Sequence, residues 1–358
     1  MADSLSYTTA EIVQVVPNLK VAQNFLLDRF FPNLVEFDTE EVAIDVDVGL
    51  RRMSPMCSPL VEGKLVEQRR YLTNKFKPAY IKDKRAPDLR KPVRRQIGER
   101  IGGELTGEER MMANLNFEMS DQVDMVNRRL EWMAASALTT GTITISGDGF
   151  PTTVIDFGRA STLTVALTGA ARWGQTLNAA GRDTNIVGQI DAWAAAILKS
   201  SGAVVTDLVF TTTPWAKFLQ AEGVQGAIYY PALASQGNEV NPGSQVKAGA
   251  VYKGRWGQYD LWVYNDWYID ASGVEQPMLA DGTVIMSGGE ALMGTRAFGM
   301  IIDPRFAYGA MAYAPKTWIN EDPAQQMLMM QSAPLVIPSR VNACLCATAV
   351  SYTHLTLP

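Results

Sequence analysis

A single long helix is the strongest constraint that the sequence places on the fold. Thr106 and Glu109 have the spacing of a capping box, in which each residue satisfies a backbone N–H group of the other at a helix start. Apolar residues then recur every three or four positions, at Met112, Leu115, Met119, Val123, Val126, Leu130, Met133 and Ala137. The pattern predicts a helix over residues 107–139, about 45 Å long. Because its one apolar stripe is so long, we expect it to lie across a sheet or a neighbouring chain.

The segment before this helix is extended. Val42, Ile44, Val46 and Val48 alternate with other residues, which predicts a strand within Thr39 to Gly49. Prolines and charges then exclude a continuous helix over residues 51–95; the prolines stand at positions 55, 59, 78, 87 and 92. A long loop or extended hairpin remains. Such segments are uncommon inside compact domains and usually reach a partner.

Charge is concentrated in the same segment. Residues 51–100 contain fifteen Lys and Arg against five Asp and Glu, although the whole chain has a net charge of −5. The other residues are therefore strongly acidic, with 17 basic and 32 acidic side chains. A basic arm on an acidic body suits either the phosphates of a nucleic acid or the acidic surface of a neighbouring copy.

A neighbouring copy is the favoured partner of the basic segment. We expect a loop with this many charges to reach outward, because isolated buried charges lose their hydration. Its apolar residues, among them Tyr71, Leu72 and Ile81, favour a strand packed on protein. The residues expected to contact another subunit are Arg69, Arg70, Lys75, Phe76, Lys77, Tyr80, Lys82, Lys84 and Arg85.

The rest of the chain alternates short strands with a few helices. Residues 142–145 and 153–157 flank Gly147-Asp148-Gly149, which predicts a hairpin. An inserted α/β unit is expected over 183–295. Its elements are an amphipathic helix from Ile186 to Leu198, a strand over 204–210, a short helix over 214–219 and strands over 251–254 and 261–264. Residues 297–345 return to short strands, including 317–319 and 335–337.

Catalytic patterns are scarce. The one histidine, His354, stands among the last five residues, and the phosphate-binding, dinucleotide-binding and nucleophile-elbow motifs do not occur. Acidic residues cluster around the strand at 42–48, namely Asp38, Glu40, Glu41, Asp45 and Asp47. Such a cluster leaves two alternatives open, a carboxylate-dependent hydrolase and a binding site for a hard cation. A solvated strand face is the favoured interpretation, so we expect no catalytic residue, metal or cofactor.

Length and composition set the remaining expectations. The chain has 358 residues, 47% of them hydrophobic, and this surplus suits large subunit interfaces. Its apolar runs are far shorter than the ~20 residues of a membrane span, and its first residues lack a secretory signal, so we expect no membrane partner and assembly in the cytoplasm. Cys57, Cys344 and Cys346 are expected to be buried thiols that act as small hydrophobes.

Several short segments, in matching order across nearly the whole chain, resemble the lambda-type major capsid family with the Hong Kong 97 phage capsid fold. They are Tyr7-Thr8-Thr9-Ala10, Phe30-Phe31, Thr39-Glu40-Glu41-Val42, Ser58-Pro59-Leu60-Val61-Glu62-Gly63, Phe76-Lys77-Pro78-Ala79-Tyr80-Ile81-Lys82, Thr295-Arg296-Ala297-Phe298-Gly299, Asp322-Pro323 and Met330-Gln331-Ser332-Ala333-Pro334-Leu335. The order of the expected elements resembles that fold too. The resemblance implies an α+β chain without enzymatic activity.

The resemblance also implies a domain organisation. It consists of an N-terminal arm and first strand (1–50), an extended basic loop (51–95), a peripheral domain with the spine helix 107–139 and a hairpin (96–169), an axial domain (170–295) and a return to the peripheral domain (296–350). Residues 351–358 do not match the family and resemble a non-native tail. The Lys, Asn and carboxylate set of the covalently cross-linked Hong Kong 97 shell cannot be placed in this sequence.

The implied function is that of a shell subunit in the virion. The partners would be further copies of the chain in hexamers and pentamers, together with a decoration protein, a scaffold and a portal. Double-stranded DNA would be enclosed without specific binding. The alternatives are a carboxylate-dependent hydrolase and a DNA-binding protein that uses the basic segment.

Overall fold

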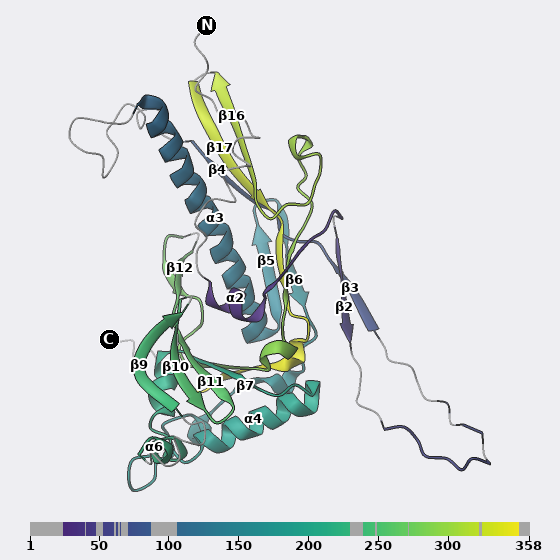
Figure 1. The fold of residues 1–358 in the computed structure, drawn as a ribbon, viewed down its shortest axis with the longest axis vertical. Helices are drawn as coiled ribbons and strands as arrows, with labels where there is room; N and C mark the ends of the chain where they lie inside the picture. The colour runs from purple at the N-terminus through teal and green to yellow at the C-terminus, as the bar shows by residue number, and fades with distance from the viewer. Residues whose placement is uncertain are drawn as a thin grey trace.

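A computed structural model describes residues 24–39, 41–47, 53–60, 62–63, 65, 71–86, 106–229, 239–247, 249–270, 272–321 and 324–350. The long helix α3 (Gly107–Thr140) runs through it as a rod (Figure 1). No helix in these ranges has the length and apolar character that a membrane span requires. The expected tail over 351–358, with His354, and the N-terminal residues before 24 lie outside the described residues.

The capping box of α3 is formed as the sequence predicts. The Glu109 backbone N–H donates to Thr106 Oγ1 over 3.2 Å, and the Thr106 N–H donates to Glu109 Oε2 over 2.6 Å. Gly141 ends the helix in the left-handed conformation, with φ 73°, which only glycine adopts without strain. The predicted helix over 107–139 is therefore confirmed.

The apolar stripe of α3 is its buried face. Leu115, Met119, Val123 and Leu130 are buried in the core. The helix packs on α2 (Phe25–Phe30), on β5 (Thr142–Gly147), and on two strands from the end of the chain, β18 (Pro334–Ile337) and β19 (Cys344–Thr348). One helix thus joins the N-terminal, central and C-terminal segments.

A seven-stranded mixed sheet lies at one end of α3. Its strands, in spatial order, are β7 (Thr164–Ala166), β19, β14 (Thr283–Ser287), β8 (Asp207–Phe210), β11 (Tyr259–Tyr264), β10 (Ala250–Trp256) and β9 (Glu239–Lys247). The helices beside it are α4 (Ile186–Ser201), α5 (Thr212–Phe218) and α6 (Glu222–Tyr229). The predicted helix at 186–198 is confirmed, and the predicted strand over 204–210 is shorter because pairing with β11 begins at Asp207. β7 and β19 lie outside residues 170–295, so this sheet is not built from that range alone.

Smaller sheets surround the spine helix. They are β1 (Asn33–Glu36) with β15 (Thr295–Phe298) and β18; β4 (Ile81–Arg85) with β17 (Ala324–Ser332) and β16 (Ala314–Glu321); the predicted hairpin of β5 and β6 (Phe150–Asp156); and the hairpin of β12 (Trp267–Ile269) and β13 (Glu275–Pro277). β1 and β15 pair in parallel although most of the chain separates them.

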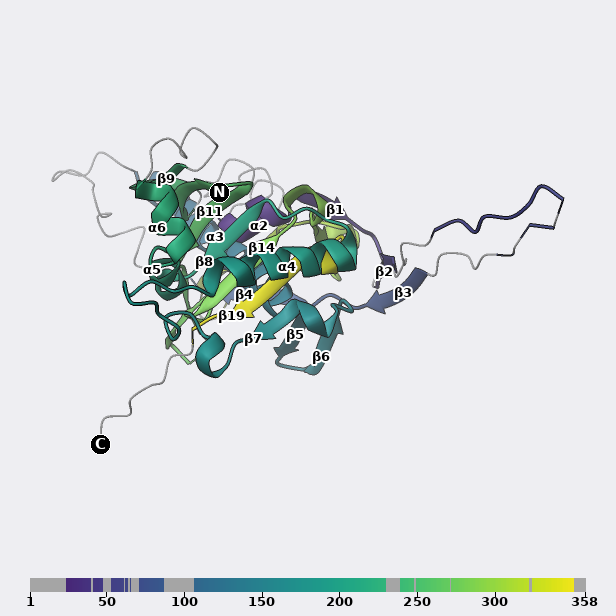
Figure 2. The same ribbon diagram turned by 90° about the horizontal axis from the view of Figure 1, so that it is seen from below.

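The predicted extended segment is a hairpin. β2 (Val42–Asp47) and β3 (Tyr71–Phe76) pair antiparallel, from Val42 opposite Phe76 to Asp47 opposite Tyr71. The described residues between the two strands project far from the body in two perpendicular views (Figures 1 and 2). We call residues 53–60, 62–63 and 65 the hairpin tip.

Candidate functional site

The hairpin tip exposes apolar side chains. Met53, Met56, Leu60 and Leu65 are between 92% and 100% exposed. Single exposed apolar residues are ordinary, but four on one projecting segment have the character of an interaction surface. They are not among the residues expected at a subunit contact, because apolar residues within a charged, proline-containing stretch give no periodic signal.

The base of the hairpin is fixed to the body. The Phe76 ring lies 6.4 Å from that of Phe157, edge to face, and packs against the main core. Tyr80 donates its hydroxyl proton to Gln331 Oε1 over 3.1 Å, and its oxygen accepts from the Ile302 N–H over 2.9 Å. The hairpin therefore projects from an anchored base.

A buried polar cluster continues this anchor. Asp303 accepts from Lys316 Nζ, from the Arg305 N–H over 3.0 Å and from Gln331 Nε2 over 3.1 Å. Burial raises the pKa of Asp303, but these donors outweigh burial and lower it to about 2. Asp303 thus stays ionised at neutral pH and links residues 303–305 to β16 and β17.

The basic residues of β4 lie on the body. Lys82 Nζ lies 5.0 Å from the Tyr80 ring centroid, and Lys84 Nζ lies 5.4 Å from that of Trp318. Arg85 forms ion pairs with Asp83 (3.2 Å), Glu118 (2.9 Å) and Asp121 (2.6 Å). The expectation that charges of this segment must seek partners outside their own subunit is wrong for Arg85, because β4 pairs with β17 beside α3.

Two other residues expected at a subunit contact lie in or beside β3. Lys75 is in β3 opposite Ala43, and Lys77 is exposed just after β3. Arg69 and Arg70 lie outside the described residues. Phe76 lies at the base of the hairpin, and Lys82, Lys84 and Arg85 lie on β4 against the body. Contact of any of the nine with another copy stays a prediction.

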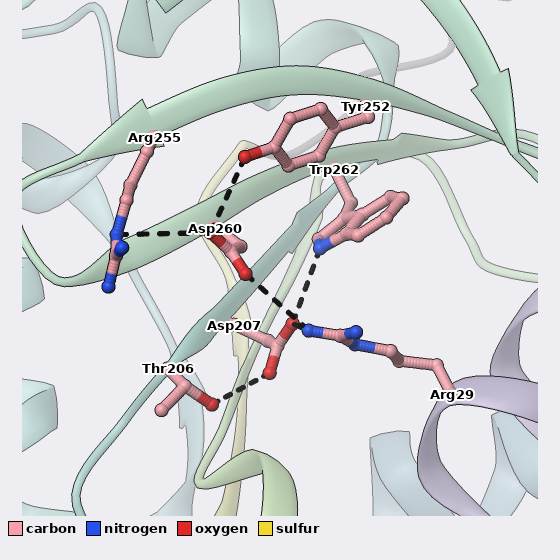
Figure 3. Close-up of polar contacts among 7 residues, drawn as sticks. All are labelled: Arg29, Thr206, Asp207, Tyr252, Arg255, Asp260 and Trp262. Carbon is pink, nitrogen blue, oxygen red and sulfur yellow. Dashed lines mark hydrogen bonds and ion pairs between the residues drawn. The ribbon is translucent and has the colours of Figure 1, made fainter. Parts of the chain in front are cut away.

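A second polar site joins α2 to the seven-stranded sheet (Figure 3). Asp207, at the start of β8, is fully buried, and its Oδ1 accepts from Arg29 Nε over 3.0 Å and Nη2 over 2.7 Å. Trp262 Nε1 donates to the same oxygen over 3.3 Å, and Thr206 Oγ1 donates to Oδ2 over 2.7 Å. Both carboxylate oxygens have partners, so this buried charge is compensated.

Arg29 also contacts two groups of β11. Its Nη2 lies 3.5 Å from Asp260 Oδ2, and its guanidinium lies 5.3 Å from the Trp262 ring centroid. A cavity of about 850 Å³ opens beside this network, lined by Arg29, Val204, Thr206, Asp207, Gly288, Gly289, Glu290, Ala291, Met293, Ser339 and Arg340. Because the polar groups of Asp207 are already bonded, we interpret the site as a structural junction.

Glu131 forms a third polar junction, on the spine helix. Its buried carboxylate accepts from the N–H groups of Leu26 (2.9 Å) and Leu27 (3.0 Å) and from the Tyr264 hydroxyl (2.9 Å). Burial raises the pKa of Glu131 to about 7 against these hydrogen bonds. One side chain thereby ties α2, α3 and β11 together. Neither Glu131 nor the pair of Arg29 and Asp207 was predicted, because their partners are remote in sequence.

The expected thiols differ in environment. Cys344 and Cys346 are buried in β19, and burial raises their pKa values to about 12 and about 11. Cys57 is exposed, so the prediction that it is buried is wrong; it lies in the hairpin tip, away from the core. Of the five clustered acidic residues, Asp45 and Asp47 are in β2, and Glu40 lies outside the described residues. Within the described ranges, no three His, Cys, Asp or Glu side chains gather as metal ligands would.

Known proteins resemble this chain over most of its length. It is 28% identical over 336 residues to the major capsid protein of Escherichia phage lambda, which covers 92% of this chain and 95% of that protein. It is 29% identical over 336 residues to the major capsid protein of Escherichia phage N15, with the same coverage.

A solved structure has the same fold. The putative capsid protein of an Escherichia coli CFT073 prophage superposes with a TM-score of 0.73 at 20% identity, covering 96% of this chain and 99% of that one. The order of a projecting hairpin, a spine helix and a central sheet is thus the α+β Hong Kong 97-like capsid fold that the sequence predicted. The sequence also matches the family described as phage major capsid protein E over residues 8–349. The chain therefore belongs to the phage major capsid protein E family.

Proposed function

We propose that this chain is a major capsid protein that assembles into the icosahedral shell enclosing phage genomic DNA, and that each copy lays its β2–β3 hairpin on the next. Family membership supports the shell, and the exposed apolar hairpin tip carries the proposal for the contact. Met53, Met56, Leu60 and Leu65 would be covered by a neighbouring copy. Contact areas repeated by symmetry then stabilise the shell even where single ion pairs contribute only ~0–1 kcal/mol.

The expected contact residues divide into two groups under this proposal. Arg69, Arg70, Lys75 and Lys77 belong to β3 or stand beside it in the sequence, and they would meet the neighbour. Phe76 and Tyr80 anchor the base of the hairpin, and Lys82, Lys84 and Arg85 contact the body, so the direct part of these five residues in the contact is smaller. The contacts that the second group makes within its own chain support its assignment to the body.

The remaining proposals concern partners and organisation. The subunits form hexamers and pentamers, and a decoration protein, a scaffold and a portal complete the head. The seven-stranded sheet is the axial domain, and α3 with the smaller sheets is the peripheral domain; β7 and β19 would extend the axial domain beyond residues 170–295. Assembly takes place in the host cytoplasm, and the subunit has no catalytic activity.

Charge reversal in the hairpin tests the contact. We expect Arg69→Glu with Arg70→Glu to give folded subunits that fail to close shells in electron microscopy. The matched control, Arg69→Lys with Arg70→Lys, keeps both charges and should assemble normally. Normal shells from the Glu variant would refute a role for these charges, and wild-type protein that remains a monomer would refute the shell.

A further inference from the structure

The hairpin of β12 and β13 exposes a second apolar surface. Trp267, Ile269 and Val274 are 51–69% exposed. Trp267 and Ile269 point to one face because residues two apart in a strand share a face, and they pair with Pro277 and Glu275. An exposed tryptophan beside two aliphatic side chains has the composition of an interface core.

The sequence neighbours of this surface are acidic. Asp266, Asp270 and Glu275 flank the three apolar side chains. Residues 256–295 contain six acidic residues and no Lys or Arg. We call Trp267, Ile269 and Val274 with their acidic neighbours the β12–β13 patch.

The patch is held in one conformation. Asp270 accepts from the N–H groups of Ser272 (2.8 Å) and Val274 (3.0 Å), and from Gln276 Nε2 (3.3 Å). The hydrogen bond from the Val274 backbone is the main cause that lowers the pKa of Asp270, so its negative charge persists at neutral pH. Asp266 accepts from the Trp267 N–H over 2.9 Å. Such order before binding reduces the entropy lost when a partner docks.

Opposite features mark the hairpin tip and the β12–β13 patch. The tip has exposed apolar side chains flanked in sequence by Arg51, Arg52, Lys64, Arg69 and Arg70, whereas the patch has exposed apolar side chains flanked by carboxylates. The two lie on opposite sides of the subunit, with β12 on the left of α3 and the projecting hairpin on the right (Figure 1). Different surfaces on opposite sides are what a ring of identical chains requires, because each interface in a ring is heterologous.

We propose that the β12–β13 patch of one copy receives the hairpin tip of the next copy. The proposal rests on the proposed function, since it needs a closed ring of subunits. Trp267 and Ile269 pack on the methionines and leucines of the tip, and the negative charges of Asp266, Asp270 and Glu275 complement the net positive charge of residues 51–100. This arrangement covers both exposed apolar surfaces of each copy and fixes the direction of the ring.

Cross-linking through the natural thiol of the tip tests the proposal. Cys57 is exposed, whereas Cys344 and Cys346 are buried with raised pKa values and should not react. Val274→Cys places a second thiol in the patch. Assembled shells of this variant, treated with a short bismaleimide, should give a ladder of covalently joined chains on a denaturing gel.

Two controls isolate the contact. Val154→Cys places an equally exposed thiol on β6, away from the patch, and Val274→Cys with Cys57→Ser removes the tip thiol. We expect several-fold more cross-linked chains from Val274→Cys than from either control, and Ile269→Lys should lower the yield. Shells that form but cross-link no better than the controls would overturn the proposed contact with the patch without contradicting the proposed shell function. Failure of the wild-type chain to form shells would overturn both.

Discussion

Arg29 offers the most quantitative test of how the subunit is held together. Its guanidinium makes two hydrogen bonds to Asp207, whose side chain has no exposed surface. Arg29→Ala would leave that carboxylate with the indole of Trp262 and the hydroxyl of Thr206 alone. Removing one partner of a buried ion pair costs ~3–5 kcal/mol because the other charge stays buried. Arg29 is 39% exposed, so water screens the pair, and we expect a loss of about 2–3 kcal/mol.

A second arginine of the same network is the matched control. Arg255 is more exposed and lies 3.9 Å from Asp260, so Arg255→Ala should change the free energy of unfolding by less than ~0.5 kcal/mol. Urea unfolding of the full-length, unassembled subunit, followed by tryptophan fluorescence, measures both. Arg29→Ala should lower the urea midpoint by on the order of 1 M. Adding Asp207→Asn to Arg29→Ala should restore part of the lost stability, since no buried charge is then left without a partner. Equal midpoints for the two alanine variants would refute the reasoning.

Three further predictions follow from the same structure. Leu130→Asp should destabilise the subunit by several kcal/mol and abolish shells, because Leu130 is buried in the stripe of α3, whereas Met125→Asp on the half-exposed face of that helix should be tolerated. Thermal unfolding and electron microscopy measure both variants, and a stable Leu130→Asp subunit that forms normal shells would show that the stripe is not core. The pKa of Glu131 is higher in the folded than in the unfolded chain, so its contribution to stability is complete below pH ~4.5 and is lost as pH rises through about 7. Urea unfolding across this pH range should show a fall in the free energy of unfolding for the wild-type chain and no such fall for Glu131→Gln. Empty shells should show no measurable affinity for duplex DNA at physiological salt in a filter-binding assay, because outside residues 51–100 the chain has 32 acidic against 17 basic residues. Tight binding would favour a DNA-binding role instead.

The sequence predicted the parts of the fold that local chemistry determines. The capping box at Thr106 and the stripe from Met112 to Ala137 are complete within one helix, so α3 was predicted to within one residue at each end. The hairpin of β5 and β6 has its turn and both strands within a short stretch. α4 followed from its own periodicity in the same way.

Pairings between distant segments were not predictable from a single sequence. β4 is one apolar residue, Ile81, followed by four charged residues, so its sequence is typical of a charged loop. Its partner β17 lies near the end of the chain. Arg85 finds Glu118 and Asp121 only because that pairing places it beside α3. Glu131 is an acidic residue inside an apolar helix, and nothing near it in sequence reveals the N–H groups of Leu26 and Leu27.

The surface that carries the proposed contact was predicted only in part. The net charge of residues 51–100 directed attention to its basic side chains, whereas the structure draws attention to Met53, Met56, Leu60 and Leu65. Apolar residues in a charged segment give no periodic signal, so their exposure became visible only once β2 and β3 were paired.

Electron cryomicroscopy of shells assembled from the full-length chain tests the central claim most directly. We expect closed icosahedral shells in which residues 53–65 of each subunit lie on the adjacent subunit. Discrete monomers, or shells in which the hairpin folds back on its own chain and leaves the neighbour uncontacted, would contradict this account.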